Sequence, residues 1–513
     1  MRLITPFLLF LVLLTAQASA QDSTLIISQP VELSKEGINE VLQLSTGNTM
    51  LFHFENKHHI RIKVFDNNGK EIASAVPELK IVDMNLLDRT YRDGLIECDG
   101  DAVLFLTQDI DNTETLMRIV FDGKTGRLKK EEKAVESASF KNNTRARVLA
   151  QPDGSYSLVC FNNNPDEDSI SLTVRRFDTK HLQYEMLTYK QKKAQKHFYG
   201  ALSSNTPKGD ILVSLLDIEE GNIAEIKTNV QFMYLRNDLH DFVVRSFMMP
   251  DNVQLEGVTF TRNEFAGNLN IVLILINKMR ALNGLRTNYY RKQEQLLMIM
   301  PEDMSTVNTS AFSGLKDIDS VTNLRSSFNI IGLRTNDRGL TTAAHLDKDP
   351  QLKYNGNVWD IFKRFIVSKY DDNGTLLSSV SIPCYHKYAI DGTSGVFGKI
   401  IDKKTAFSFY EVVTNNSVYF LFNDIPQNEK ATTLIDVKEV ADFDNTDAMI
   451  CHVNKKSILT KKWLVNKTDS NEHYQVIAPS GHYYEKTKMY STLMRKKNGK
   501  QQTYHMLWRK LED

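Results

Sequence analysis

A turn motif recurs along this chain at a nearly fixed spacing, each time at the end of an apparent β-strand. An aromatic residue followed by aspartate precedes a short polar turn at Phe65-Asp66, Phe121-Asp122 and Phe177-Asp178, and again at Tyr370-Asp371. The first three motifs are 56 residues apart. A repeat of this length made of strands and turns is typical of a β-propeller with four-stranded blades. The sequence therefore predicts an all-β fold, a single β-propeller.

The first three repeats each divide into four short segments in which apolar and polar residues alternate. Ile60, Ile62 and Val64 show the two-residue period that a half-buried strand requires. Short Gly-containing links, such as Thr46-Gly47-Asn48, join the first and second strands of a repeat. The expected strands are 40–44, 49–55, 59–66 and 70–76, then 94–98, 102–107, 115–122 and 127–133, then 147–151, 155–161, 169–178 and 182–187.

The two ends of the chain predict how the ring closes. The last two expected strands, 488–496 and 502–510, leave no residues for another strand. Segment 24–31 is a strand without a blade of its own. Pairing this segment with the last blade would remove exposed sheet edges. We therefore predict eight blades, closed by the N-terminal strand, with seven blades as the alternative.

The first twenty residues have the pattern of a secretory signal peptide. Arg2 precedes the apolar run 7–14, and Ala18-Ser19-Ala20 forms a small-residue cleavage site. No later apolar run is long enough for a membrane-spanning helix. We expect a signal peptide at 1–20, cleavage before Gln21, and a propeller over 21–513, exported to the periplasm or the extracellular space.

Charge and cysteine content bound the partners and cofactors. Lys+Arg and Asp+Glu both total 63, so no overall basicity favours a nucleic-acid partner. The four cysteines are far apart and form no CxxC pair, which argues against a zinc site. The stretches 109–114 and 442–447 carry spaced Asp and Asn oxygens, but they lack the complete EF-hand pattern. We expect no cofactor, with calcium as the alternative.

The lengths of the links between the expected strands differ between the two faces of the ring. Links between first and second strands, and between third and fourth strands, are mostly short and Gly-rich. The links on the opposite face are long and varied: 162–168, 278–293, 347–359, 424–447, 77–93, 190–197 and 384–392. Long loops in compact domains are commonly functional. We therefore expect the ligand site on the loop-rich face, at the mouth of the central channel.

Basic and aromatic residues supply the candidate contacts on that face. Arginines near the starts of innermost strands could converge and hold an anionic group; the alternative is that each pairs with a local carboxylate. Loop 278–293 carries basic residues with two tyrosines among them, which could hold a sugar or a polyanion; the alternative is a solvated loop. Two aromatic residues in loop 347–359 are further candidate contacts. The candidate ligand-binding residues are Arg92, Arg145, Arg147, Tyr289, Tyr290, Arg325, Tyr354 and Trp359.

The segment from Asn416 to Asn428 resembles a segment of secreted bacterial β-propeller-like proteins that have no assigned activity. That resemblance implies an exported all-β chain and brings no catalytic residues with it. The sequence contains no GxSxG, P-loop or HExxH motif. We expect a binding module for a glycan, an anionic ligand or an envelope protein. The alternatives are a carbohydrate-active hydrolase or lyase with its site at the channel mouth, and a structural component of an envelope assembly.

Overall fold

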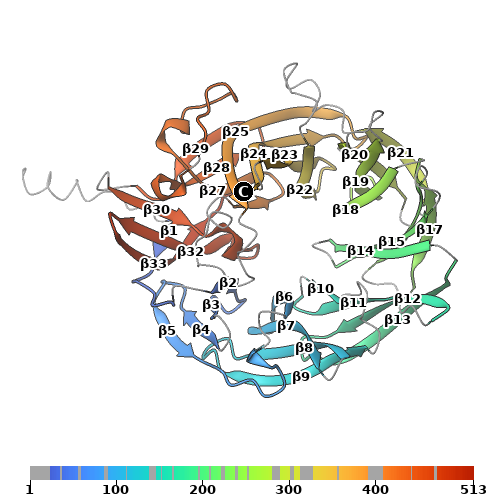
Figure 1. Ribbon diagram of the computed structural model, residues 1–513, viewed down its shortest axis with the longest axis horizontal. Helices are drawn as coiled ribbons and strands as arrows, with labels where there is room; N and C mark the ends of the chain where they lie inside the picture. The colour runs from blue at the N-terminus through green and yellow to red at the C-terminus, as the bar shows by residue number, and fades with distance from the viewer. Residues whose placement is uncertain are drawn as a thin grey trace, which may run out of the picture.

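The computed structural model shows a closed ring of eight blades around a central channel (Figure 1). The blades follow one another around the ring in chain order, from blue to red. The all-β class and the count of eight blades are as predicted from the sequence. The structure describes residues 24–34, 37–55, 59–85, 90–110, 113–137, 146–151, 153–163, 167–194, 197–206, 209–220, 226–236, 241–250, 253–279, 289–300, 305–311, 327–354, 357–390, 408–440, 442–466 and 471–512.

Each of the first seven blades is an antiparallel sheet of four consecutive strands. Blade I contains β2 (Ile38–Gln43), β3 (Thr49–Phe54), β4 (Ile60–Phe65) and β5 (Glu71–Ala75), and blade II contains β6 (Tyr91–Cys98), β7 (Asp101–Ile110), β8 (Thr113–Phe121) and β9 (Leu128–Ser137). Blade III contains β10 (Ala146–Ala150), β11 (Tyr156–Asn162), β12 (Ser169–Phe177) and β13 (Gln183–Lys192), and blade IV contains β14 (His197–Asn205), β15 (Ile211–Glu220), β16 (Ile226–Leu235) and β17 (Val243–Met248). Blade V contains β18 (Val253–Asn263), β19 (Asn268–Met279), β20 (Tyr289–Ile299) and β21 (Thr306–Ala311), and blade VI contains β22 (Ser327–Thr335), β23 (Thr341–Tyr354), β24 (Asn357–Tyr370) and β25 (Leu376–Ile390). Blade VII contains β26 (Phe409–Val413), β27 (Val418–Asp424), β28 (Asp447–Val453) and β29 (Leu459–Trp463).

The N-terminal strand completes blade VIII and closes the ring, as the sequence predicts. This blade has the order β30 (Glu472–Val476), β32 (Met489–Asn498), β33 (Gln501–Lys510) and β1 (Leu25–Ile27), and the short β31 (His482–Tyr484) also pairs with β32. In the β1–β33 ladder Ile26 lies opposite Trp508. The Trp508 indole N–H donates to Thr49 Oγ1 of blade I over 2.8 Å. The two ends of the chain therefore meet in one sheet that contacts the first complete blade.

The recurring Phe-Asp motif forms the hairpins between third and fourth strands. Asp66 Oδ1 accepts the backbone N–H groups of Asn68 and Lys70, each over 2.9 Å. Gly69 in this turn has φ +78°, a conformation that L side chains rarely adopt. Phe65 points the other way and meets Trp508 edge-on, with ring centroids 5.7 Å apart. The aspartate thus stabilises the turn, and the aromatic residue joins its blade to the preceding one.

The hydrophobic core is divided among the interfaces between blades. One cluster of buried apolar side chains lies at each interface, including the closing interface between blades VIII and I. At the interface of blades I and II, Phe52 and Phe121 meet edge-on at 5.6 Å. Each blade is therefore stabilised by both of its neighbours. The ends of the innermost strands line the channel.

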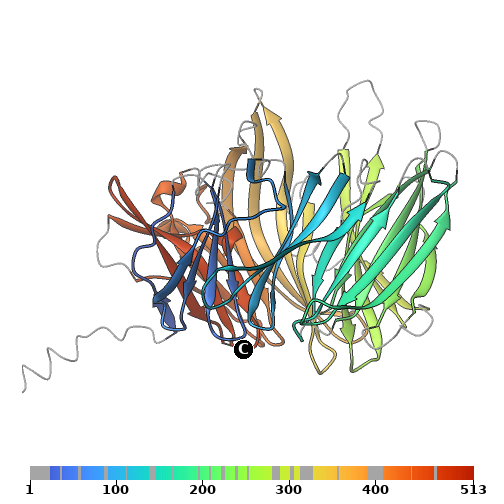
Figure 2. The same ribbon diagram turned by 90° about the horizontal axis from the view of Figure 1, so that it is seen from below.

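Two of the loops predicted on the loop-rich face are largely strand. Of a third, 278–293, the structure describes 278–279 and 289–293, which belong to β19 and β20. The predicted loop 347–359 is the outer part of the β23–β24 hairpin, and the predicted link 384–392 is largely the end of β25. Figure 2 shows the long strands of blade VI projecting beyond the rest of the ring on one side. The loop prediction was therefore wrong at these places.

All four cysteines lie in strands and carry free thiols. Cys98, Cys384 and Cys451 are buried, whereas Cys160 is partly exposed. Burial raises the pKa of the Cys451 thiol to about 12, which keeps it protonated at neutral pH. Within the part of the chain that the structure describes, no helix has the length and hydropathy that crossing a membrane would need.

Candidate functional site

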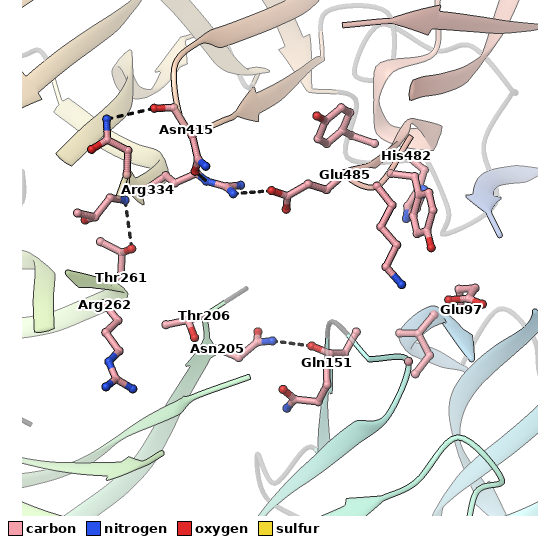
Figure 3. A pocket seen from close by; sticks show the side chains of 18 of the residues that line it. Glu97, Gln151, Asn205, Thr206, Thr261, Arg262, Arg334, Asn415, His482 and Glu485 are labelled. Atoms are coloured by element: carbon pink, nitrogen blue, oxygen red, sulfur yellow. Dashed lines mark hydrogen bonds and ion pairs between the residues drawn. The ribbon is translucent and has the colours of Figure 1, made fainter. Parts of the chain in front are cut away.

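The central channel contains a cavity of about 760 Å³ on the face with the short turns. Its lining comes from the ends of the innermost strands and from the links that follow them, and every blade contributes (Figure 3). Blade I supplies Leu42, and blade VIII supplies the run from His482 to Lys486. The cavity therefore lies at the end of the channel opposite the loop-rich face on which we expected the site.

Uncharged hydrogen-bonding groups make up much of the wall. The carboxamides are Gln151, Asn205, Asn336 and Asn415, and the hydroxyls include Thr206, Thr261 and Thr335. Contacts between neighbouring blades hold several of them in place. Asn205 Nδ2 donates to the Ala150 carbonyl over 2.7 Å, and the Thr335 N–H donates to Thr261 Oγ1 over 3.2 Å. These side chains are positioned before any ligand arrives.

One segment of blade VIII forms a distinct part of the wall. Residues 477–488, which we call the blade VIII insertion, join β30 to β32 and contain a 3-10 turn, η5 (Ala478–Ser480), and β31. The Tyr483 N–H donates to the Tyr410 hydroxyl of blade VII over 3.0 Å. The Gln43 N–H of blade I donates to His482 Nδ1 over 3.2 Å. The insertion is therefore anchored to both neighbouring blades beside the cavity.

Burial keeps His482 neutral. Removal from water lowers the pKa of His482 to about 4, far below neutral pH. Since Nδ1 accepts the Gln43 N–H, the proton of the neutral ring lies on Nε2. His482 therefore adds a hydrogen-bond donor to the lining without adding a charge.

The charged groups of the lining are nearly balanced and mostly engaged with the chain. Arg334 pairs with Glu485 of the blade VIII insertion, and Figure 3 shows the two side chains reaching toward one another. Arg262 lies 3.2 Å from Glu264 and 3.5 Å from buried Asp210. Glu97 Oε1 accepts the Ser45 hydroxyl and the Gly100 N–H, each over 2.7 Å. The remaining charged lining residues are Asp337 and Lys486.

The two predicted arginines that the structure describes lie near the loop-rich ends of neighbouring innermost strands. Arg92 near the start of β6 pairs with Glu40 of blade I, and its guanidinium lies over the Phe54 ring, 5.3 Å from the centroid. Arg147 on β10 is exposed. Arg92 thus follows the alternative in which an arginine pairs with a local carboxylate. Arg145 and Arg325 lie outside the described residues.

The predicted aromatic contacts lie on the long hairpins of blades V and VI. Tyr289 and Tyr290 begin β20, opposite Met279 and Lys278 of β19. Tyr354 ends β23, and Trp359 lies on β24 opposite Leu352. The structure describes only the backbone at these four positions. Of the predicted residues whose side chains the structure describes, Arg92 and Arg147, neither lines the cavity.

The stretch suggested for calcium, 442–447, uses its carboxylates within the protein. Asp442 Oδ1 accepts the Asp444 N–H over 3.0 Å. Asp444 pairs with Arg495 at 2.8 Å and Lys497 at 2.9 Å. Asp447 Oδ1 accepts the Tyr474 N–H over 2.9 Å. Among the described residues, no group of three or more His, Cys, Asp or Glu side chains is arranged to hold a metal ion. In the other stretch, 111 and 112 lie outside the described residues.

We did not predict the cavity from the sequence, because many of its residues lie in the short links between the innermost two strands of each blade, and those links carry no ligand-binding motif. Short turns on one face of a propeller still surround the channel, and their polar residues converge there. One signal was available in the chain. The link between the innermost two strands of blade VIII is longer than the Gly-containing turns of the first blades, and it carries His482, Tyr483, Tyr484 and Glu485.

Comparisons with known proteins show similarity in fold only. No protein-family model matches the chain, and no curated protein is similar to it in sequence. A crystal structure of an apocarotenoid oxygenase chimera aligns over 95% of both chains, with 8% identity and a TM-score of 0.36. A variant of the Synechocystis apocarotenoid oxygenase aligns over 95% of this chain and 92% of its own, with 10% identity and a TM-score of 0.34. A polysaccharide lyase, an ulvan lyase, aligns over 85% of this chain and 98% of its own, with 8% identity and a TM-score of 0.39. These are distant structural similarities, and no family is assigned.

Proposed function

We propose that this protein is an exported binding module that holds a hydroxyl-rich ligand, a saccharide, in the cavity at the short-turn mouth of its channel. The observation that supports this most is the lining, in which carboxamides, hydroxyls and tyrosines from neighbouring blades surround one hollow. Carboxamides both donate and accept hydrogen bonds, and aromatic rings stack on sugar faces. Such a set of groups matches a polyol better than it matches an apolar ligand.

Unused hydrogen-bonding capacity in the wall supports the proposal. The Gln151 carbonyl oxygen and the Tyr484 hydroxyl are buried and have no hydrogen-bond partner among the described residues. A buried polar atom without a partner costs free energy, and it commonly marks a place where water or a ligand completes the network. Both residues line the cavity. If either side chain turned toward the cavity, a bound hydroxyl group would reduce that cost.

Binding is favoured over hydrolysis by the state of the acidic groups. Cleavage of a glycoside by a pair of carboxyl groups needs both of them available at the scissile bond. Of the carboxyl groups that line the cavity, Glu97 already accepts two hydrogen bonds from the chain, and Glu264 lies 3.2 Å from Arg262. We therefore place the hydrolase or lyase alternative second, and turnover of any bound glycan would restore it.

A glycan array followed by calorimetric titration of the best member tests the proposal. Asn205→Leu replaces a carboxamide of the lining with an apolar side chain, and we expect at least a tenfold loss of affinity. Asn67→Leu makes the same change at an exposed turn position that is not part of the lining, and it should bind as the parent does.

Arg147→Ala supplies the test of the opposite face. If this change abolished binding while Asn205→Leu left it intact, the ligand would occupy the loop-rich face and the cavity proposal would be wrong. Absence of binding to every member of the array would overturn the saccharide assignment itself. Export is tested separately, by finding whether the mature protein in the periplasm or medium begins at Gln21.

A further inference from the structure

The guanidinium of Arg334 is held rigidly at the wall of the cavity. Arg334 leaves the end of β22, and its Nε donates to Asn415 Oδ1 over 2.7 Å. Its Nη1 lies 3.5 Å from the Val413 carbonyl of blade VII. Only 17% of the side chain is exposed. Contacts with the neighbouring blade therefore fix the plane of the guanidinium and leave Nη2 directed at Glu485 of the blade VIII insertion.

The partner of Arg334 is held much more loosely. Glu485 belongs to the blade VIII insertion, and its side chain is 55% exposed. Among the described residues, its carboxylate makes the ion pair with Arg334. Arg334 and Glu485 come from blades VI and VIII, so the pair reaches past blade VII along the cavity wall (Figure 3). An ion pair this exposed on one side contributes little to stability. Glu485 can therefore leave Arg334 at low cost.

We propose that Glu485 is an internal stand-in for a carboxylate of the ligand, and that Arg334 selects acidic saccharides, those containing uronic acid. This inference rests on the proposed function of the cavity and adds the class of sugar. When an acidic sugar enters, its carboxylate takes the place of Glu485 on the guanidinium, and Glu485 turns outward into solvent. The planar guanidinium suits a carboxylate because two parallel hydrogen bonds can form.

The charges around the pair favour an anionic ligand once Glu485 has moved away. Arg262 stays close to Glu264 and Asp210, and Glu97 stays bound by Ser45 and Gly100. Lys486 and Asp337, which also line the cavity, carry opposite charges, so displacement of Glu485 leaves Arg334 as a cation without its carboxylate. A neutral sugar cannot compensate that charge. The pair thus disfavours neutral ligands and admits acidic ones.

An array of glycans in matched sets, each hexose beside the corresponding hexuronate and sulfated hexose, tests the inference on the full chain. Glu485→Gln removes the competing charge at nearly constant size. We expect it to raise affinity for uronate members about two- to fivefold, the range that a partly exposed ion pair is worth, and to leave neutral members unchanged. Glu429→Gln makes the same change at an exposed position of loop 424–447 and should have no effect.

Arg334→Lys provides the complementary measurement. It keeps the positive charge but loses the planar pair of donors, so affinity for uronate members should fall at least tenfold. Circular dichroism and the melting temperature show whether the variant is folded. Glu485→Gln is expected to bind more tightly, and a folding defect cannot cause tighter binding. The inference can therefore still be tested if Arg334→Lys does not fold.

The outcomes separate the inference from the proposed function. If neutral and acidic members bound equally and Glu485→Gln changed neither, the role of Arg334 and Glu485 would be wrong while the saccharide site would stand. Preference for sulfated over carboxylated members would also overturn the inference, because it assigns a planar carboxylate. If no member bound, both the inference and the proposed function would fall.

Discussion

Aspartate and asparagine close short turns in several blades with the same hydrogen bonds. Asp178 Oδ1 accepts the N–H groups of Lys180 and Leu182, and Asn454 Oδ1 accepts those of Lys456 and Ile458, all within 3.0 Å. This local pattern could be recognised in the sequence because it depends on residues only two to four positions apart. The cavity residues could not, because Arg334 and Glu485 meet only once the ring has closed.

The turn at Asp122 gives a prediction for acid stability. Burial alone would raise the pKa of Asp122, but hydrogen bonds from Thr125 and Lys124 outweigh it and lower the pKa to about 2. A carboxyl group whose pKa is lowered by folding stabilises the fold above its unfolded pKa and loses that contribution as the pH falls toward 2. We expect Asp122→Ala to reduce the free energy of unfolding by about 1 kcal/mol at pH 7, and by much less near pH 2.

Urea unfolding of the parent and of Asp122→Ala at several pH values checks this prediction. Asn67→Ala, in an exposed position of the corresponding turn of blade I, serves as the control for a substitution that leaves the aspartate bonds in place. An equal loss of stability for Asp122→Ala at pH 2 and pH 7 would contradict the ionic origin of the effect.

Buried Asp424 gives the opposite pH dependence. Burial raises the pKa of Asp424 to about 6, although Asn428 and Ile425 donate to it. A carboxyl group with a raised pKa stabilises the fold fully below its unfolded pKa, and that contribution is lost as the pH rises through 6. Asn can keep both accepted hydrogen bonds on its own Oδ1. We therefore compare the free energy of unfolding of Asp424→Asn with that of the parent at each pH. The variant should gain on the parent by on the order of 2 kcal/mol between pH 4 and pH 7.5.

Denaturant unfolding at the two pH values measures the effect. The difference between the pH values is the informative quantity, because it cancels any change in packing that the substitution itself causes. If the stability difference between variant and parent were the same at both pH values, ionisation of Asp424 would not destabilise the folded protein, and the prediction would be wrong.

At the scale of elements, the sequence predicted the strands of the regular blades well and the long hairpins poorly. The strands of blades I to III lie within a few residues of the predicted ranges, and outer strands such as β13 alternate between a half-buried and an exposed face. The outer part of β23 was predicted as loop because it is rich in charged residues and contains Pro350. The ladder shifts register between Asp349 and Leu352, which lets the strand accommodate a proline.

The N-terminal strand gives the prediction at this scale. Removing residues 24–31 would uncover β33, whose Met506 and Trp508 are buried at the interface with blade I. It would also remove Val31, whose N–H donates to the Tyr504 carbonyl over 2.7 Å. Exposure of a buried sheet edge and its apolar side chains should cost several kcal/mol.

Thermal unfolding of the chain shortened to begin at Glu32 checks this prediction, with a chain beginning at Gln21 as the control. We expect a clearly lower melting temperature and a stronger tendency to associate through the open edge of blade VIII. Equal melting temperatures for the two chains would show that the ring does not depend on the N-terminal strand for closure.

At the scale of the whole molecule, the ring has two different ends. One end carries projecting hairpins and long links, and it was the site predicted from the sequence on the basis of loop length. The other end carries short turns, yet the channel there opens into a cavity of about 760 Å³ with residues from every blade. Loop length can be read from a sequence. The eight strand ends converge on one axis only in the closed ring, so the cavity could not be read from the sequence.

Hydrogen–deuterium exchange of the protein with and without a saturating glycan from the array tests directly which end binds the ligand. Our account predicts slower exchange at the short-turn mouth, in the links around Gln151, Asn336 and Asn415 and in the blade VIII insertion. It predicts unchanged exchange at the loop-rich ends of β20 and β24 and in loop 424–447. Protection of those strand ends or that loop, with no change at the short-turn mouth, would contradict the account.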